Sequence, residues 1–241
     1  MIRRVPSDFV LGATTAAYQV EGGTDLDGRL PAEWDHWYDR PGSSFDGRSA
    51  SDFYHHYQED IAHCRQYNIR ALGISIAWTR IIGDEQGTVN EAGVKFYSDV
   101  IDCCLEQGVE PYVALYHFDS PKFIFDQGEW LAPHTGEQFL HYARICFEQF
   151  GSRVKHWITM KDPVSLVVNE YVTGLFPPAR SFQIGQAVHA LHKLLVAHAR
   201  TVNLYKSMDL PGSIGLVHRA EAVYPLAGPV QNERAAELDD A

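Results

Sequence analysis

Short apolar segments rich in β-branched residues alternate along the chain with longer segments whose apolar residues recur at helical spacing. The short segments, which predict strands, are 9–14, 72–78, 111–116, 154–160 and 213–217. Between them, helices are predicted to begin near Ser51, Asn90 and Gln183, and a further helix is predicted to end near Phe150. This alternation predicts parallel strands joined by right-handed crossovers.

The apolar positions of two of these helices predict which face is buried. In the helix that ends near Phe150 they are Phe139, Tyr142, Ala143, Cys146, Phe147 and Phe150. In the helix that begins near Gln183 they are Ile184, Val188, Leu191, Leu195, Val202 and Tyr205.

Two folds share this alternation, the doubly wound sheet and the (β/α)₈ barrel. No Gly-x-Gly-x-x-Gly motif follows the first strand, so the dinucleotide-binding signature of the doubly wound fold is absent. Polar and aromatic residues instead follow the strands at their carboxyl ends, where a barrel builds its active site. These residues are Gln19, Trp78, His117, Asp119 and Asp162.

Only five strands fit into the 241 residues, because the connections at 22–50 and 161–182 are long. The sequence therefore predicts an α/β chain of TIM-barrel type that is incomplete and holds about the first five β/α units. Residues 1–241 are expected to form the N-terminal portion of a single barrel domain, with a helix beginning at 234–241. A complete small barrel with unrelated chemistry would need three further strands.

Composition narrows the range of partners. Lys and Arg total 20 against 31 Asp and Glu, which gives a net charge of −11. Such a charge disfavours nucleic-acid and anionic membrane partners, and no stretch approaches the roughly 18 apolar residues of a membrane helix. Four cysteines are too few for a disulfide scaffold, and no signal-peptide-like run follows Met1, so we expect a cytoplasmic protein. The histidines at 189, 192 and 198 form no zinc motif, so neither a metal nor a cofactor is expected.

Four ordered motifs resemble those of glycoside hydrolase family 1. Residues 9–22 (FVLGATTAAYQVEG) are similar to the opening of that family, 74–81 (ISIAWTRI) to its second strand and 115–121 (LYHFDSP) to its third. Residues 154–163 (VKHWITMKDP) fall where the family carries its acid/base motif, Thr-x-Asn-Glu-Pro. The segments most similar to the 6-phospho-β-galactosidase branch are 50–55, 176–178, 215–218 and 234–238.

The resemblance implies a retaining glycosidase that hydrolyses O-glycosidic bonds in β-galactosides or β-glucosides, with or without a 6-phosphate. Such an enzyme uses two carboxyl groups roughly 5–5.5 Å apart, one as the nucleophile and one as the proton donor. By resemblance, Gln19 and His117 match residues that bind sugar hydroxyls, and Trp130 is expected to line the same pocket. Asp162 occupies the acid/base position.

The sequence departs from the family pattern in ways that affect catalysis. The Asn-Glu pair reads Lys161-Asp162, and the shorter Asp162 places its carboxyl about 1 Å short, a misplacement that can cost on the order of 10²-fold. Lys161 replaces an amide expected to bind the sugar 2-hydroxyl, and its ammonium beside Asp162 would favour the ionised carboxylate rather than a proton donor. Gly73 stands where the family usually carries an Arg that supports the nucleophile. The nucleophile and the phosphate-binding loop belong to later strands of the family.

Two functions therefore remain open. The chain is either the N-terminal part of a 6-phospho-β-glycosidase that works with a C-terminal half-barrel, or an inactive, truncated relative that at most binds sugar or a partner. The residues at 73, 161 and 162 favour the second function. An incomplete sheet also predicts self-association, because open strand edges and an uncovered apolar interior invite pairing.

Overall fold

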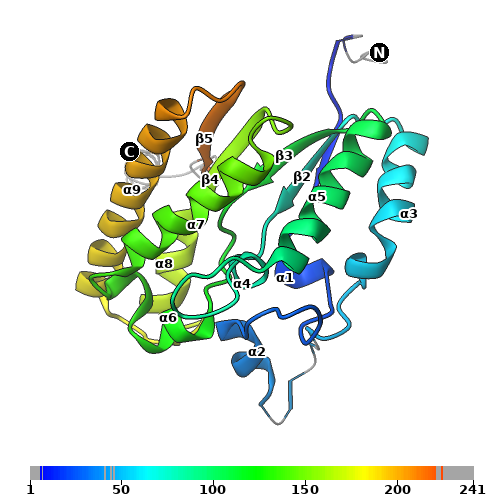
Figure 1. Cartoon of the computed structure of the whole chain (residues 1–241). Coiled ribbons are helices and arrows are strands. Elements are labelled where there is room, and N and C mark those ends of the chain that lie inside the picture. The colour runs from blue at the N-terminus through cyan, green and yellow to red at the C-terminus, as the bar shows by residue number, and fades with distance from the viewer. Residues whose placement is uncertain are drawn as a thin grey trace.

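A computed structural model describes residues 8–40 and 47–220, together with residues 6, 42, 43, 45 and 224. At its centre is a parallel sheet of five strands in the order β1-β2-β3-β4-β5 (Figure 1). The strands are β1 (Gly12–Thr14), β2 (Ala71–Ser75), β3 (Glu110–Ala114), β4 (His156–Lys161) and β5 (Ser213–Val217). Each strand pairs in parallel with the next strand in the sequence, as in the first five units of a (β/α)₈ barrel. The predicted incomplete barrel is confirmed.

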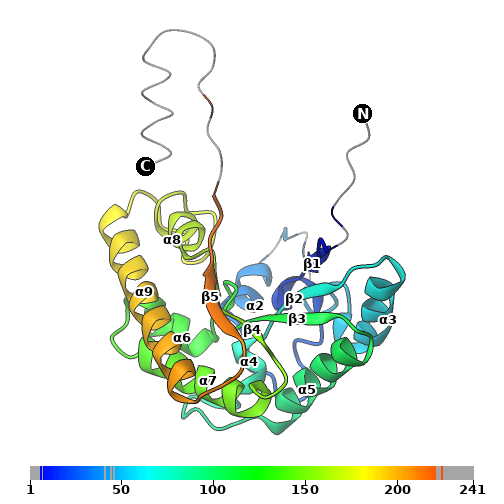
Figure 2. The same ribbon diagram turned by 90° about the horizontal axis from the view of Figure 1, so that it is seen from above.

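Four long helices cover the convex side of this sheet. They are α3 (Phe53–Gln66), α5 (Glu91–Glu106), α7 (Thr135–Phe150) and α9 (Ile184–Ser207), and Figure 2 shows them as an arc outside the strands. Helix α5 begins where the sequence predicts it, because the Asn90 side chain caps it by accepting a hydrogen bond from the Ala92 amide at 3.2 Å.

Short helices occupy the connections that follow the carboxyl ends of the strands. They are α1 (Ala17–Val20), α2 (Glu33–Tyr38), α4 (Trp78–Ile81), α6 (Lys122–Asp126), the 3₁₀ helix η1 (Glu129–Leu131) and α8 (Pro163–Tyr171). These connections carry most of the candidate site residues, as expected for the carboxyl edge of a parallel barrel.

The buried face of α7 is the predicted one, since all six of its apolar positions are at most 1% exposed. The prediction for α9 is wrong in part, because Ile184, Val188 and Leu195 are exposed. A different face of α9 is buried, and it consists mainly of small residues: Ala187, Ala190, Leu194, Ala197, Thr201, Leu204 and Tyr205. Small side chains let α9 approach α7 and α8 closely, and this close packing outweighs the larger residues in setting the buried face.

The first strand is shorter than predicted. Phe9, Val10 and Leu11 precede β1 and are about half exposed, whereas segment 9–14 was expected to be a strand throughout. Within the described part of the chain, β1 and β5 each pair on one side only. The apolar residues at 9–11 suggest that β1 should begin earlier. Among the described residues, however, such an extension has no second strand to pair with.

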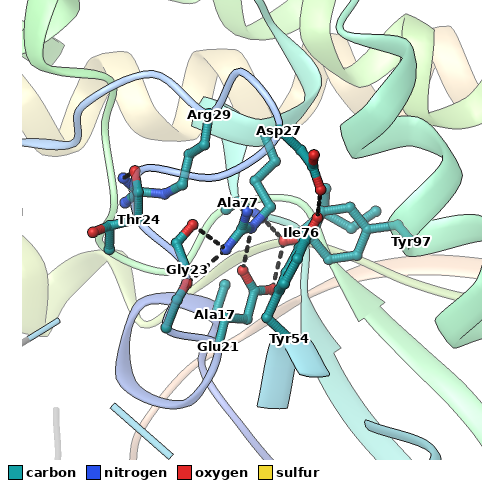
Figure 3. A network of polar contacts seen from close by, with 12 residues as sticks. Ala17, Glu21, Gly23, Thr24, Asp27, Arg29, Tyr54, Ile76, Ala77 and Tyr97 are labelled. Atoms are coloured by element: carbon teal, nitrogen blue, oxygen red, sulfur yellow. Dashed lines mark hydrogen bonds and ion pairs between the residues drawn. The ribbon is translucent and has the colours of Figure 1, made fainter. Parts of the chain in front are cut away.

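A buried polar network fixes the connection that follows β1 (Figure 3). The Arg80 Nε donates to Glu21 Oε2 at 2.7 Å, and an Arg80 terminal nitrogen donates to the Gly22 carbonyl at 2.7 Å. The Tyr97 hydroxyl donates to Glu21 Oε1 at 2.6 Å, and the Tyr54 ring lies 4.3 Å from the guanidinium carbon. Because Glu21 directly follows α1, this network sets the position of the helix that carries Gln19.

Within the described residues, no helix has the length and apolar character needed to cross a membrane. The helix predicted at 234–241 and the family-like segment 234–238 lie outside the described residues.

Candidate functional site

Gln19 and His117 line one pocket at the carboxyl edge of the sheet. Gln19 lies on α1 after β1, and His117 follows β3, so two separate connections bring them together. The pocket has a volume of about 330 Å³. Its walls are mainly aromatic, and the lining residues are Ala16, Tyr18, Gln19, Trp34, Tyr38, Phe45, His117, Phe118 and Phe176. A mostly apolar cavity with a few polar groups is typical of a small-molecule site.

The aromatic wall is rigid because its rings pack on one another. Trp34 and Tyr38 from α2 stack with ring centroids 5.7 Å apart, and Phe176 meets Trp34 edge-on at 5.1 Å. The Trp34 indole N–H donates to the Phe118 carbonyl, which joins α2 to the loop after β3. The sequence analysis assigned no role to these aromatic residues, although three of them lie in the connection 22–50 that it found unusually long.

His117 is neutral at physiological pH. Burial, together with the nearby positive charge of Lys161, lowers the pKa of His117 from its ordinary value to about 4. Its Nδ1 is buried and has no hydrogen-bond partner among the described residues. A neutral imidazole with an unpaired ring nitrogen can donate to, or accept from, a sugar hydroxyl.

The structure places Trp130 in the core and not in the lining of this pocket. Trp130 is 1% exposed, and its indole N–H donates to the Tyr116 hydroxyl at 3.1 Å. Its ring packs edge-on against Tyr116 and Phe139. The sequence-based expectation that Trp130 lines the pocket is therefore not met, because Tyr116 and Phe139 enclose its ring.

Asp162 makes contacts that organise the backbone around it. Its backbone adopts a left-handed conformation (φ 43°), and its Oδ1 accepts from the Ser165 amide at the start of α8 and from the Arg219 amide, each at 3.5 Å. His218 Nδ1 lies 3.6 Å from the same oxygen. These contacts involve Oδ1 alone, and both N–O distances are at the outer limit of a hydrogen bond, so they orient the carboxyl group without occupying its second oxygen.

Lys161 points away from Asp162 and into the concave side of the sheet. Its Nζ donates to the Thr14 Oγ1 at 2.5 Å, although the two residues are on β4 and β1. The ion pair with Asp162 that the sequence suggests is not formed, since the described residues place no carboxylate within 4.0 Å of this ammonium. Successive residues of a strand point to opposite sides, and Asp162 lies just beyond the end of β4.

Gly73 lies beside the same threonine. It is the register partner of Thr14, and a Cβ added at Gly73 would lie 2.8 Å from Thr14 Oγ1 and 3.1 Å from Thr14 Cβ. A side chain at position 73 would therefore require the Thr14 side chain to move. Thr14 and the Lys161 ammonium occupy the neighbouring volume.

Three buried glutamates from separate connections meet in the interior, a feature that the sequence analysis missed. They are Glu33 on α2, Glu129 on η1 and Glu170 on α8, and one oxygen of each has no partner among the described residues. Burial, reinforced by neighbouring carboxylates, raises the pKa of Glu33 and of Glu170 well above the ordinary value. Ser120 Oγ donates to Glu129 Oε1 at 2.7 Å. The three glutamates belong to separate connections, so no spacing along the sequence indicates that they meet.

The arrangement can bind a polar ligand, but it does not contain both groups that retaining hydrolysis requires. Gln19 and the neutral His117 offer hydrogen bonds beside aromatic walls, while none of the described residues that line the pocket is a carboxylate. Asp162, which is not among the pocket-lining residues, contacts two backbone amides through Oδ1. A second carboxylate, about 5–5.5 Å from the first in a retaining mechanism, would have to come from outside the residues that the structure describes.

Comparison with known proteins gives a consistent result for the whole chain. The profile described as Glycosyl hydrolase family 1 matches residues 1–241. A 6-phospho-beta-galactosidase of Clostridium acetobutylicum is 46% identical over 232 residues, which cover 96% of this chain and 49% of that protein. A 6-phospho-beta-galactosidase 1 of Streptococcus pneumoniae is 40% identical, covering 99% of this chain and 50% of its own length.

Solved structures show the same relationship. A family 1 β-glucosidase from Thermotoga maritima superposes with a TM-score of 0.89 at 33% identity, covering 97% of this chain and 53% of the other. Beta-glucosidase 2 from the fungus Trichoderma reesei gives a TM-score of 0.89 at 34% identity, covering 97% and 52%. The chain spans about half the length of the curated relatives it matches. Its sequence over all 241 residues and its five-stranded parallel sheet together show that it belongs to glycosyl hydrolase family 1.

Proposed function

We propose that this chain provides the sugar-binding half of a glycosidase site, with β-galactosides as the sugar class, and that hydrolysis needs a carboxylate from residues outside it. The observation that carries the proposal is the single aromatic pocket shared by Gln19 and the neutral His117. The names of the relatives, 6-phospho-beta-galactosidases, support a galactoside, phosphorylated or plain. Residues 1–241 would act as one N-terminal domain portion, in association with a C-terminal half-barrel. The four free thiols support a cytoplasmic location.

A second candidate is a relative that binds sugar or a partner without turnover. Three observations favour it: position 162 holds the shorter aspartate, position 161 holds an ammonium, and position 73 is a glycine whose added Cβ would lie 2.8 Å from Thr14 Oγ1. Sugar binding is common to the first candidate and to the sugar-binding form of the second, and restored hydrolysis distinguishes the two.

Titration of the chain with galactose, followed by NMR of the histidine ring signals, tests the shared part of both candidates. With half of a barrel present, we expect a millimolar Kd, which corresponds to a binding free energy of about −4 kcal/mol. His117→Phe and Gln19→Leu should each remove binding, while His141→Phe, a change at an exposed histidine on α7, should leave it intact. If the His117 signals do not respond at high galactose concentration, sugar binding by this chain is ruled out.

Co-expression with the C-terminal half of a 6-phospho-beta-galactosidase relative separates the two candidates. Release of the aryl group from an aryl 6-phospho-β-galactoside by the paired halves would support the hydrolytic candidate. Sugar binding without any such release would support the non-catalytic one.

A further inference from the structure

The ammonium of Lys161 lies inside the curve of the sheet, and no described residue supplies a counter-charge within 4.0 Å of it. Burial lowers its pKa, and no charged neighbour contributes to that shift, so the charge is partly desolvated without compensation. The described residues give it one hydrogen-bond partner, the uncharged Thr14 hydroxyl at 2.5 Å. A partly buried charge without a partner costs free energy, which a bound ion of opposite sign would offset.

The contact between Lys161 and Thr14 also locates the ammonium. In the sheet, β1 and β4 are separated by β2 and β3, so neighbouring spacings of about 4.8 Å place them about 14 Å apart along the sheet. A lysine side chain can bridge that separation only across the concave face, where the curvature shortens the path. The ammonium therefore lies over the interior of the incomplete barrel.

The strand positions beneath the ammonium carry small or no side chains. Thr14 pairs with Gly73 and Gly12 pairs with Ala71, which places these four residues on one face of β1 and β2. Gly12 and Thr14 are exposed. Two protons of the ammonium remain available, since a lysine has three donors and only one is used.

His117, a polar residue of the sugar pocket, lies close to the Lys161 ammonium. The Lys161 amide donates to the carbonyl of Tyr116, the residue before His117, at 3.0 Å. The positive charge of Lys161 contributes to the low pKa of His117, which confirms that the two side chains are near each other. His117 lines the pocket as a neutral imidazole, whose one ring N–H is a possible donor to a negatively charged ligand.

We propose that the Lys161 ammonium is the centre of an oxyanion site on the concave face of the sheet, and that its ligand carries a carboxylate or a phosphate group. General attraction cannot account for such binding, because the chain carries a net charge of −11 and repels anions at long range. The inference rests on the proposed function for the sugar and deepens it, because it assigns the negatively charged group of the ligand to a place beside Lys161.

Calorimetric titration of the 241-residue chain with acetate, inorganic phosphate, galacturonate and neutral galactose tests the proposal. We expect phosphate or acetate to bind, and a sugar that presents its anion to Lys161 to bind at least tenfold more tightly than galactose. Lys161→Met should remove anion binding, and Lys161→Arg should retain it. Lys155→Met, a change at an exposed lysine just before the same strand, is the matched control and should retain it as well.

A second measurement reports on Lys161 directly. An oxyanion bound beside the ammonium should raise its pKa, which NMR of the lysine side-chain signals can follow with and without phosphate. The proposal is overturned if none of the three anions binds, or if Lys161→Met binds them as the unchanged chain does.

The two proposals fail in distinguishable ways. Galactose binding without any preference for anions would overturn the oxyanion site and leave the sugar site intact. Binding of acetate or phosphate with no response to either sugar would support the oxyanion site, identify a free anion as its ligand and count against the sugar site.

Discussion

The carboxylate of Glu21 and the guanidinium of Arg80 form an ion pair, with Arg80 Nε 2.7 Å from Glu21 Oε2, and both side chains are at most 6% exposed. The pair joins the end of α1 to α4, and α1 carries Gln19. It therefore links the stability of the fold to the position of one of the two polar groups of the sugar pocket.

Breaking this pair should strongly destabilise the chain. Glu21→Gln leaves the Arg80 charge buried and unpaired, so we expect the free energy of unfolding to fall by about 3–5 kcal/mol in urea denaturation. The matched control is Glu137→Gln, which breaks the exposed pair of Glu137 with Arg200 and should have no resolvable effect. Equal losses in the two variants would contradict the role assigned to the buried pair.

The three buried glutamates should make stability depend on pH. Because their pKa values are raised in the folded chain, the folded state keeps protons that the unfolded state releases near the ordinary glutamate pKa of about 4.3. The contribution of these groups is therefore fully present below that value, and it is lost as the pH rises through their higher folded pKa values.

Replacement of one of these glutamates should reduce that dependence. Glu170→Gln keeps the shape of the side chain and removes one acid. Between pH 5 and pH 9, the melting temperature of this variant should therefore fall less than that of the unchanged chain. Glu148→Gln, at an exposed position on α7, serves as the control and should leave the slope unchanged. Parallel curves for the Glu170 variant and the unchanged chain would contradict the prediction.

A side chain at position 73 should be tolerated only when Thr14 is replaced by a smaller residue. Gly73→Ala places a Cβ 2.8 Å from Thr14 Oγ1, and such overpacking typically costs about 1–3 kcal/mol. Thr14→Gly combined with Gly73→Ala removes both close contacts, so it should be more stable than expected from the sum of the single changes. Urea denaturation of the four chains measures this coupling, and additive effects would show that the two positions are independent.

Hydrolysis by the isolated chain should be undetectable, because none of the described residues that line the pocket is a carboxylate. When the chain is paired with the C-terminal half of a relative, Lys161→Asn with Asp162→Glu should raise turnover of an aryl 6-phospho-β-galactoside by orders of magnitude. The longer acid would reach the glycosidic oxygen, as general acid catalysis requires. The paired halves with and without the double change are compared across pH, and equal rates would show that Asp162 already acts as a competent acid.

The open sheet edges should cause the isolated chain to associate. Leu11, just before β1, is 48% exposed, and β1 pairs only with β2 in the described residues. Leu11→Lys places a charge at this edge and should reduce association, since charges at edge strands oppose edge-to-edge pairing. Sedimentation velocity would measure the effect, and a sharp monomer peak from the unchanged chain would contradict the prediction.

The order of the strands and helices, and the family, could be predicted from the amino-acid sequence alone. The β-branched segments, 213–217 among them, predicted the strand positions to within a few residues. This is possible because apolar residues recur at different spacings in strands and helices, and this spacing is a local property of the sequence. The pairing of Gln19 with His117 also followed from sequence, because both follow strands whose carboxyl ends share one edge of the sheet.

Three features could not be predicted from the sequence: the contacts of Lys161, the burial of Trp130 and the meeting of Glu33, Glu129 and Glu170. The buried face of α9 was likewise set by how closely two neighbouring helices approach it. Each of these features joins side chains from connections far apart in the sequence, so no local period encodes it. The curvature of the sheet brings Lys161 to Thr14 across 147 positions, and packing among three connections, not spacing along one of them, places the carboxyl groups together.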